Sequence, residues 1–480
     1  MVVLTTFRAL QFNVEYGGGL VDLEKTAEAV HLAAADVVGL AEPYHNLRHI
    51  ADAAGYAHHN VSLQLLSRHP IWEPSGADGL WGLVEVRPGR FVVVCNVHLD
   101  DVSYGPAALQ SGEPLAAVLA REREVRGAAL RPHRDVLPRL AAEGYPVLLL
   151  GDFNEPSSLD YVAATVGSRP QVTHAVPWPV SADLLSLGFR DSWRDAHPEP
   201  VADPGLTWPA ARPAVAAWAD DASGPAPHDR IDYIYAAGPC RTLASVLVGE
   251  PEAPGVALSV DPWPSDHRAV LSTFEISPHE PHVLLGVTAR LLGLGEALGV
   301  AARVRGISAG VEIRSEGAAA TALWAEPVAA GGGRFEVALD PARFQPGSYR
   351  VALRAGGELV ADVPVRVRDP RAGLRLETGR PAYAVGEPIG VRWTDGPANR
   401  WDWICVCRAG ADPFTDRPLV WDYTGRHESG TVPAAVDGEL TLDGRSQGGQ
   451  WPMPPGAYVV LYLLTDGYEE AARTGFTVVT

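Results

Sequence analysis

Hydrophobic positions in the first part of the chain form two kinds of pattern. Continuous apolar runs, such as Val147–Leu150, are typical of buried strands. Apolar residues at helical spacing from Asp22 to Ala35 predict a helix with Asp22 as its N-cap. Further strands are predicted at 4–12, 36–40, 63–71, 81–86, 91–99, 231–235 and 269–274, and a helical stretch, interrupted near Pro132, at 115–143. Many strands with few helices favour an α/β sandwich of mixed sheets over a doubly wound parallel sheet.

The pattern changes after about residue 277, where helical spacing disappears. Short alternating segments then recur between Gly and Pro turns, as expected for an antiparallel β-sandwich. A second such unit is predicted to begin near Pro370. Its sequence Pro-Gly-Ala-Tyr, which ends at Tyr458, repeats the Pro-Gly-Ser-Tyr that ends at Tyr349, so we expect the two units to be similar. We therefore predict three domains: residues 1–276, followed by two immunoglobulin-like β-sandwiches at 281–368 and 369–480.

The length of 480 residues fits two or three domains. No apolar run reaches the roughly 18 residues of a transmembrane helix. The first residues lack the pattern of a signal peptide, which favours a cytoplasmic location, with a secreted or periplasmic one expected if the N-terminus has been shortened. The four cysteines are too few for a disulfide framework and are expected to be buried free thiols.

The net charge of -19 is unevenly distributed along the chain. Residues 1–276 contain 34 acidic and 19 basic side chains (-15), and the remainder contains 24 and 20 (-4). Proteins that hold long nucleic acids usually present a basic face. The charge therefore argues against tight nucleic-acid binding, although it allows a small phosphate-ester substrate.

Polar side chains follow several of the predicted strands. The run 147–150 is followed by Asp152 and Asn154, which lie on the same side of an extended chain. Asn13 and Glu42 end two earlier strands, and the sequence Ser265-Asp266-His267 comes later. Such hard oxygen ligands suit Mg²⁺ or Mn²⁺ better than zinc, and the set includes no obvious serine or cysteine nucleophile. The sequence therefore predicts a hydrolase that uses one or two divalent ions to act on phosphate.

Seven short motifs occur in one order across residues 4–276. They are Phe12-Asn13-Val14, Glu42, Leu66-Ser67-Arg68-His69-Pro70-Ile71, Asn96-Val97-His98-Leu99, Gly151-Asp152-Phe153-Asn154, Asp229-Arg230-Ile231-Asp232-Tyr233-Ile234 and Ser265-Asp266-His267. In this order they resemble the endonuclease/exonuclease/phosphatase superfamily. The resemblance implies the four-layer α/β sandwich of pancreatic deoxyribonuclease for this part of the chain, and it says nothing about the rest.

The resemblance also implies roles for the residues that carry a metal ion. Glu42 resembles the principal metal ligand of the family, and Asn13 and Asp266 look like partners of that metal or of a second one. Asp152 resembles the residue that orients the attacking water or binds the second metal.

Other residues match the family's catalytic and phosphate-binding positions. His267 resembles the imidazole next to the scissile phosphate, and Asp232 its orienting carboxylate, although Asp229 competes for that role. Asn154 is expected to hydrogen-bond a phosphoryl oxygen. His98, in Asn-x-His-Leu, is similar to the histidine that contacts phosphate or acts as an acid, and this motif argues against an AP endonuclease. Asn96 and Arg68 are further candidates for substrate binding, although arginine in the latter motif is often structural.

These observations predict a phosphodiesterase for a small or medium-sized substrate, in which water attacks in line with the leaving group. A phosphomonoesterase, or a nuclease on DNA or RNA, is the alternative within the same class. In a different class, the first domain is an inactive scaffold and the sandwiches bind a glycan or a protein. The retention of Glu42, Asp152 and His267 argues against that reading. The sequence does not indicate an oligomeric state.

Overall fold

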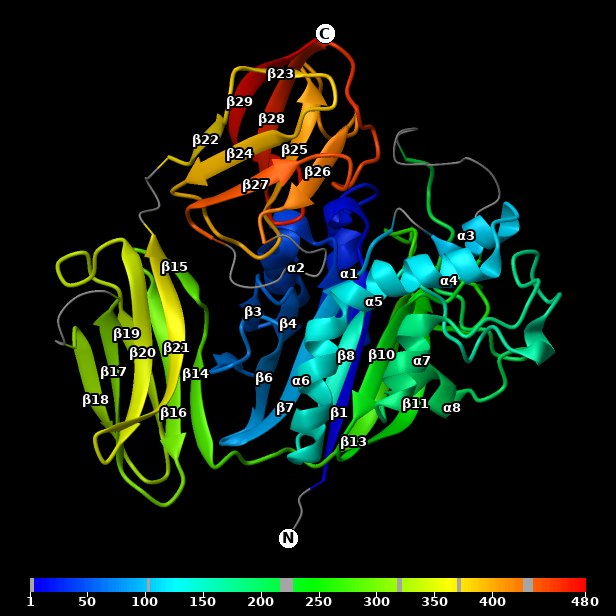
Figure 1. The fold of residues 1–480 in the computed structure, drawn as a ribbon. Helices are drawn as coiled ribbons and strands as arrows, with labels where there is room; N and C mark the ends of the chain where they lie inside the picture. Colours follow the sequence, from blue (N-terminus) through cyan, green and yellow to red (C-terminus); the bar gives the residue numbers. More distant parts are fainter. Residues whose placement is uncertain (1–3, 102–103, 216–227, 317–321, 369–372, 426–434) are drawn as a thin grey trace. The chain divides into compact units, whose positions relative to one another are not determined.

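The computed structural model describes residues 4–101, 104–215, 228–316, 322–368, 373–425 and 435–480 (Figure 1). The chain divides into two compact units. Among the described residues, the first unit comprises those in 4–70 and 91–279, and the second comprises those in 71–90 and 280–480. The three-domain division stays a prediction about which parts fold independently.

Two sheets form the centre of the first unit. Among the described residues, seven strands pair in the order β12-β11-β13-β1-β2-β4-β3, and a second group pairs in the order β7-β8-β10-β9. Their bounds are β1 Thr5–Asn13, β2 Val37–Ala41, β3 His58–Asn60, β4 Leu65–Ser67, β7 Arg90–His98, β8 Val147–Asp152, β9 Arg190–Asp191, β10 Asp232–Ala237, β11 Cys240–Gly249, β12 Val256–Ser259 and β13 Ala269–Ile276. The sheets face one another, with β1 packed against β8 and β10.

Helices cover the outer faces of both sheets. α1 (Leu23–Ala33) and α2 (Leu47–Ala54) share a buried core with β1 and β2. The remaining helices are α3 Gly105–Gln110, α4 Leu115–Glu124, α5 Arg126–Ala129, α6 Arg131–Ala142, α7 Pro179–Ser186 and α8 Ser192–Ala196, with 3-10 turns η1 Tyr16–Gly18, η2 Tyr44–Asn46 and η3 Ala163–Thr165. α6 packs on β8, and α8 contacts both β10 and β11. The order helix, sheet, sheet, helix is the predicted four-layer α/β sandwich of mixed sheets.

Local sequence accounts for several boundaries in this unit. The predicted N-cap of α1 is confirmed, since the Asp22 side chain accepts a hydrogen bond from Glu24 N. The helical stretch at 115–143 breaks at Val125 and again at Leu130, and Pro132 lies in the first turn of α6, where its missing N–H costs nothing. In place of the single strand predicted at 63–71, the structure has two strands: β4 ends at Ser67, and the next strand begins at Ile71.

A buried amide connects the two sheets of the first unit. Asn96 on β7 is 1% exposed, and its Nδ2 donates to Leu40 O on β2 at 2.7 Å. Gly39 makes room for this contact, since a Cβ there would lie 2.6 Å from Asn96 Oδ1. Asn96 thus links the two sheets through its side chain. We therefore do not assign a substrate-binding role to Asn96.

The second unit contains two β-sandwich parts with the same strand order. In the first part the sheets are β14-β16-β19 and β15-β21-β20-β17-β18, and in the second they are β22-β24-β27 and β23-β29-β28-β25-β26. The bounds are β14 Val283–Val287, β15 Leu291–Gly293, β16 Ala297–Val304, β17 Ala309–Ser315, β18 Trp324–Val328, β19 Gly333–Ala338, β20 Gly347–Ala355 and β21 Glu358–Arg368, then β22 Arg375–Thr378, β23 Ala382–Ala384, β24 Ile389–Thr394, β25 Trp403–Arg408, β26 Val420–Tyr423, β27 Gly438–Leu442, β28 Gly456–Leu464 and β29 Glu469–Val479. Since both sheets match strand for strand, the two parts are structural repeats.

The repeated Pro-Gly-x-Tyr sequence makes the same local structure in both sandwich parts. Tyr349 OH donates to Gln345 O, and Tyr458 OH donates to Pro454 O, each at 2.6 Å and each to the carbonyl four residues upstream. Both tyrosines are buried in their own hydrophobic core. The prediction of two β-sandwiches is therefore confirmed. The assignment of these sandwiches to the immunoglobulin-like type stays a prediction.

The segment Ile71–Arg90 belongs to the second unit because of strand pairing. β5 (Ile71–Pro74) pairs antiparallel with β14, and β6 (Gly82–Arg87) pairs antiparallel with β5.

The four cysteines are free and buried. None of the helices in the described part of the chain has the length and hydropathy of a membrane-spanning segment.

A buried ion-pair network supports the segment that leads into β10. Arg230 Nε and Nη2 each donate to the carboxylate of Asp160 at 3.0 Å, and Arg194 Nε donates to it at 2.7 Å. Asp160→Ala is expected to destabilise the protein by about 3–5 kcal/mol, because two buried guanidinium groups lose their shared carboxylate. Urea unfolding measures this, with Asp183→Ala as control: that residue pairs with Arg134 at the surface, and its loss is expected to cost about 1 kcal/mol or less. Equal effects of the two changes would contradict the prediction.

Candidate active site

Four strands of the first unit end, and a fifth begins, at one place, where they bring polar side chains together. β1 and β2 are parallel, so Asn13 at the end of β1 lies beside the chain that leads to Glu42. β7 and β8 are also parallel, and His98 is the register partner of Asp152. β10 runs antiparallel to β8, which makes Asp232 the partner of Asp152 on its other side. Strand pairing alone therefore explains why residues far apart in sequence meet here.

Asn13 connects two of the carboxylates. Its Nδ2 donates to Glu42 Oε1 and to Asp152 Oδ2, each at 3.0 Å, while its Oδ1 accepts from Glu15 N. His98 Nε2 lies 3.9 Å from Glu42 Oε1 and 3.8 Å from Asp152 Oδ2. In this orientation the Asn13 amide presents its donor to the carboxylates. The geometry thus fits a residue that positions Glu42 and Asp152.

The loops around this point hold several non-glycine residues in the left-handed region. Glu15, Tyr16, Glu42, Tyr44 and Asn154 have φ between 44° and 56°. This conformation costs L-residues roughly 1–2 kcal/mol each, and such strain clusters at functional sites. At Glu42 it aims the carboxylate inward, where Oε2 accepts from Tyr16 N at 2.9 Å.

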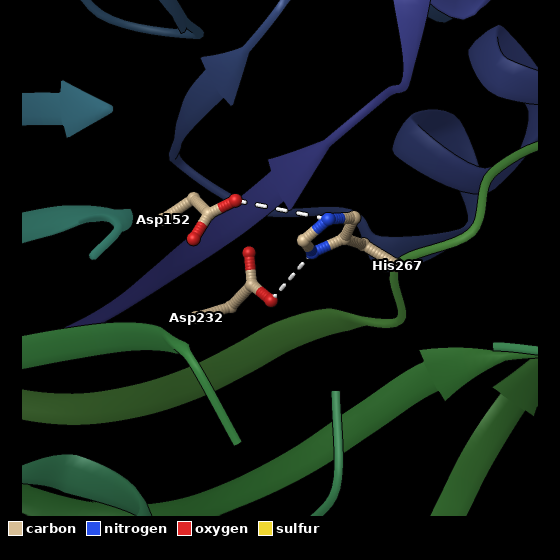
Figure 2. A group of neighbouring side chains, drawn as sticks. All are labelled: Asp152, Asp232 and His267. Carbon is tan, nitrogen blue, oxygen red and sulfur yellow. Dashed lines mark hydrogen bonds and ion pairs between the residues drawn. The ribbon is translucent and has the colours of Figure 1, made fainter. Parts of the chain in front are cut away.

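His267 lies between two buried carboxylates (Figure 2). Its Nδ1 is 2.9 Å from Asp232 Oδ2, and its Nε2 is 3.7 Å from Asp152 Oδ2. Asp232 is fully buried, and its other oxygen accepts from Gln11 Nε2 at 3.0 Å. Because a carboxylate accepts, His267 donates its Nδ1 proton to Asp232, which directs Nε2 towards Asp152 and the site.

Burial and neighbouring charges shift the protonation of this group. Burial, together with Asp232, raises the pKa of Asp152 to about 6, although His267, His98 and the Asn13 amide oppose the rise. Burial disfavours the imidazolium of His267, but the carboxylates of Asp232, Asp266 and Asp152 outweigh it and raise the His267 pKa well above its usual value. The site therefore pairs a carboxylate that is a better base than usual with an imidazole that holds its proton at neutral pH.

Two sets of residues could hold a divalent ion. Asp152, Asp232 and His267 each offer a ligand atom within 4.8 Å of the others. These side chains are 0%, 0% and 7% exposed; His267 Nδ1 is hydrogen-bonded to Asp232, and its Nε2 lies 3.7 Å from Asp152 Oδ2. The side chains of Glu42 and Asp266 are 20% and 28% exposed. Since Mg²⁺ keeps several of its waters, the two partly exposed carboxylates are the better place for it.

Sequence reasoning missed several residues of this region. Glu15 lies two residues after Asn13 and is 3% exposed, and its Oε2 accepts from Asp266 N at 3.0 Å. Arg212 donates to both Glu15 oxygens at 2.6 Å. Burial and Asp266 raise the pKa of Glu15 to about 7, against the lowering effect of Arg212. The two-residue spacing from Asn13 could have identified Glu15, whereas no periodicity marks Arg212.

Ser265 and Trp208 fix the segment that carries Asp266 and His267. Ser265 Oγ donates to Asn13 O at 2.7 Å and accepts from His267 N at 3.0 Å. Trp208 Nε1 donates to Asp266 Oδ2 at 3.0 Å, and its ring lies 6.3 Å from that of His267. The stretch 210–228 is rich in Ala, Pro and Asp, which predicts a surface loop over the site, and its residues 216–227 lie outside the described part of the chain.

Asn154 lies at the site, whereas Arg68 does not reach it. Asn154 N donates to Asp152 Oδ1 at 2.9 Å, and Asn154 Nδ2 donates to Leu99 O, so it closes a turn at the tip of β8. Arg68 is exposed, and its guanidinium lies 5.9 Å from the Tyr56 ring centroid. We therefore leave Arg68 out of the proposed function.

Asp229 is separate from the His267 pair. It is fully buried and accepts from Tyr104 Oη at 2.8 Å, from Tyr161 Oη at 3.0 Å and from Arg169 at 3.3 Å. The carboxylate that contacts the His267 imidazole is Asp232. Asp229 instead connects Tyr104, which precedes β8 in the sequence, with Tyr161 and Arg169, which follow it.

The raised pKa of His267 predicts a pH-dependent stability of the metal-free protein. The folded state binds this proton more tightly than the unfolded state does. The stabilisation is therefore complete below the unfolded pKa of about 6.5 and is lost as the pH rises through the higher folded-state value. As the pH rises above about 6.5, wild type should lose stability relative to His267→Gln in urea unfolding with EDTA. Parallel pH curves for the two proteins would contradict this assignment.

One family model and one protein of known sequence match this chain. Residues 10–267 match the model of the Endonuclease/Exonuclease/phosphatase family. An uncharacterized protein of Caenorhabditis elegans is 28% identical over 291 residues, which are 56% of this chain and 90% of that protein.

The solved structures that the chain matches include the following three. An endonuclease/exonuclease/phosphatase from Beutenbergia cavernae is 18% identical with a TM-score of 0.32, over 75% of this chain and 99% of that one. A truncated TDP2 from Caenorhabditis elegans is 18% identical with a TM-score of 0.34, over 56% and 98%. A mannosyl-6-phosphatase from Bacteroides thetaiotaomicron is 15% identical with a TM-score of 0.32, over 56% and 99%. The family model matches residues 10–267, which are more than half of this chain, and the chain therefore belongs to the endonuclease/exonuclease/phosphatase family.

Proposed function

We propose that the chain is a divalent-metal-dependent phosphodiesterase in which water attacks phosphorus. The observation that carries this proposal is the position of His267, held by Asp232 with its Nε2 directed towards Asp152. Next to this group are the partly exposed carboxylates of Glu42 and Asp266. The arrangement combines a proton donor, a base and ligands for a hard cation, which are the parts that phosphate ester hydrolysis requires.

Glu42 and Asp266 are the residues that would hold Mg²⁺ or Mn²⁺. Their oxygens are hard donors, and their exposure leaves room for water or substrate. Asn13 positions Glu42 through the hydrogen bond from Nδ2. When bound, the ion supplies positive charge that stabilises the phosphoryl oxygens in the transition state.

Asp152 and His267 manage the protons of the reaction. Asp152 orients the attacking water and accepts its proton, a task for which its raised pKa suits it at neutral pH. His267 presents its Nε2 proton to the phosphoryl group while Asp232 fixes the ring through Nδ1. His98 and the amide of Asn154 contact the remaining phosphoryl oxygens from the ends of β7 and β8.

A phosphodiester of small or medium size is the substrate class that we favour. The net charge of -15 over residues 1–276 repels long polyanions, which opposes a processive nuclease. A phosphomonoesterase is the second candidate, and a monoester of the same leaving group distinguishes the two.

Hydrolysis of bis-p-nitrophenyl phosphate by the full chain tests the proposal. Protein treated with EDTA and then supplied with Mg²⁺ or Mn²⁺ should release p-nitrophenol, and the rate with p-nitrophenyl phosphate should be lower. A faster reaction with the monoester would favour the phosphomonoesterase. No turnover of either ester with either ion would favour the scaffold alternative and count against the enzyme.

A further inference from the structure

Tyr16 and Tyr44 place two aromatic rings beside Glu42, one of the two proposed metal ligands. Tyr16 N donates to Glu42 Oε2 at 2.9 Å, and Tyr44 Oη donates to the same oxygen at 3.4 Å. The ring centroids of the two tyrosines lie 6.4 Å apart with an interplanar angle of 72°, which is an edge-to-face arrangement. Both side chains are partly exposed. We call these two tyrosines the aromatic corner.

The backbone holds both tyrosines in a conformation that bulky residues seldom adopt. The φ angle is 44° at Tyr16 and 46° at Tyr44, in the left-handed region. This region is unfavourable for residues with a Cβ, whereas glycine adopts it readily. The chain therefore keeps tyrosine at two positions that suit glycine, although both rings stay partly exposed. Backbone strain of this kind concentrates at functional positions.

Hydrogen bonds between the two loops fix the aromatic corner. Gly17 N donates to Glu42 O at 2.8 Å, and Asn46 Nδ2 donates to Gly17 O at 2.9 Å. The loops also pack closely, since a Cβ at Gly17 would lie 3.3 Å from Tyr44 Cδ2. The rings are thus positioned before a substrate binds, which reduces the entropy lost on binding.

The charges around the aromatic corner favour an uncharged occupant. Glu15 and Glu42 lie within two residues of the tyrosines and repel a further phosphate group. Attraction for a cation is weakened because both Glu15 oxygens accept from Arg212 and because Glu42 is a proposed metal ligand. An aromatic ring packs well against a tyrosine in either an edge-to-face or an offset arrangement.

We propose that the aromatic corner binds a planar ring of the phosphodiester substrate, either an aryl group or a nucleobase. The phosphoryl group is held at Glu42, and the adjacent rings of Tyr16 and Tyr44 select its substituent. The two tyrosines are therefore specificity-determining residues. This inference rests on the proposed function, because a substituent reaches the aromatic corner only if the phosphoryl group binds beside it.

Binding of phosphonates tests the inference without turnover, because phosphoesterases do not cleave a C–P bond. Calorimetric titration of the Mn²⁺-loaded full chain compares phenylphosphonate with methylphosphonate. Wild type should bind phenylphosphonate about 10-fold more tightly, which lies in the lower part of the range for one stacked ring. Tyr16→Gly and Tyr44→Gly should each lower this preference, and the double change should remove it.

Glycine is the informative replacement, because it removes the ring and suits the left-handed backbone. In thermal unfolding, Tyr44→Gly should be at least as stable as Tyr44→Ala. Tyr44→Phe loses the hydroxyl that reaches Glu42 but keeps the ring, and it should retain the preference for phenylphosphonate. Tyr468→Ala removes a partly exposed tyrosine of the second unit and is the matched control, expected to bind both phosphonates as wild type does.

Two further titrations identify the kind of ring. Thymidine 5′-phosphate is compared with deoxyribose 5-phosphate in wild type and in Tyr44→Gly. A preference for the thymidine compound that Tyr44→Gly lowers assigns the aromatic corner to a nucleobase, and equal binding assigns it to an aryl group. Tighter binding of 2-aminoethylphosphonate than of phenylphosphonate would contradict the inference, because the occupant would then be a cation.

The remaining contrary results separate this inference from the proposed function. Equal affinity of wild type for phenylphosphonate and methylphosphonate would overturn the inference and leave the metal-dependent function standing. An unchanged preference in the folded double variant would do the same. No binding of either phosphonate in Mn²⁺ would count against the phosphate site itself. Because the wild-type titration alone can overturn the inference, it does not depend on the variants folding.

Discussion

His267→Ala should lower kcat for bis-p-nitrophenyl phosphate by about 10²–10⁴-fold, the usual contribution of a general acid or base. The imidazole is the group whose Nε2 faces the site, and its partner Asp232 keeps it protonated and oriented. Asp232→Asn should lower kcat in the same way, because an amide no longer stabilises the imidazolium. Steady-state kinetics in saturating Mg²⁺ measures both effects.

The matched control for this prediction is a histidine away from the site. His49 lies on α2 with a half-exposed side chain, and His49→Ala should leave kcat unchanged. Thermal unfolding of each variant checks that the fold is retained. If folded His267→Ala hydrolyses the diester at the wild-type rate, His267 is not part of the reaction.

Glu42→Gln should weaken Mn²⁺ binding by at least about 100-fold and lower kcat/KM by roughly 10³-fold. Loss of an outer partner of a metal site typically costs 10–100-fold in affinity, and a direct carboxylate ligand contributes at least the upper end of that range. Several kcal/mol of charge stabilisation at phosphorus disappears with the ion, which gives the larger effect on rate. Calorimetric titration with Mn²⁺ measures the affinity, and diester hydrolysis measures the rate.

Two further variants decide which carboxylates hold the ion. Glu28→Gln, on the exposed face of α1, should change neither quantity. Asp232→Asn should keep Mn²⁺ affinity while losing activity, since we place Asp232 behind His267. The opposite pattern, with metal binding lost in Asp232→Asn and kept in Glu42→Gln, would move the ion to the group of Asp152, Asp232 and His267.

The part of the site that the sequence predicted consists of residues at strand ends. Asn13, Glu42, His98 and Asp152 follow apolar runs, and parallel pairing of those runs brings the ends together. The spacing within the motif at 229–234 favours Asp232 over Asp229 as the partner of His267, and Asp232 is the carboxylate that is hydrogen-bonded to the imidazole. Polar residues at the ends of strongly patterned strands are predictable because the strand itself determines where they point.

The part that could not be predicted depends on loops and on long-range contacts. Arg212 reaches Glu15 from 197 positions along the chain, and no spacing rule connects the two. Asn96 stands in a motif that suggested a substrate contact, but the approach of β2 at Gly39 makes it a link between sheets. The sequence could not reveal that approach, because the packing of one sheet on another leaves no local periodicity.

The second unit shows the same division between local and long-range information. The shared Pro-Gly-x-Tyr sequence predicted two similar sandwiches, and Tyr349 and Tyr458 make the same hydrogen bond in each. The identical order of all strands in the two parts was not predictable, because it depends on pairings between segments far apart in the chain. Likewise, β5 pairs with β14 across more than two hundred residues.

A single experiment tests both the requirement for a metal ion and the attack of water at phosphorus. Metal-free wild-type protein is mixed with bis-p-nitrophenyl phosphate in ¹⁸O-labelled water, and the products are analysed by mass spectrometry before and after Mg²⁺ is added. We predict no hydrolysis before the addition, and afterwards p-nitrophenyl phosphate that carries one ¹⁸O atom alongside unlabelled p-nitrophenol. Hydrolysis that is indifferent to Mg²⁺, or label found in the p-nitrophenol, would contradict metal-dependent attack of water at phosphorus.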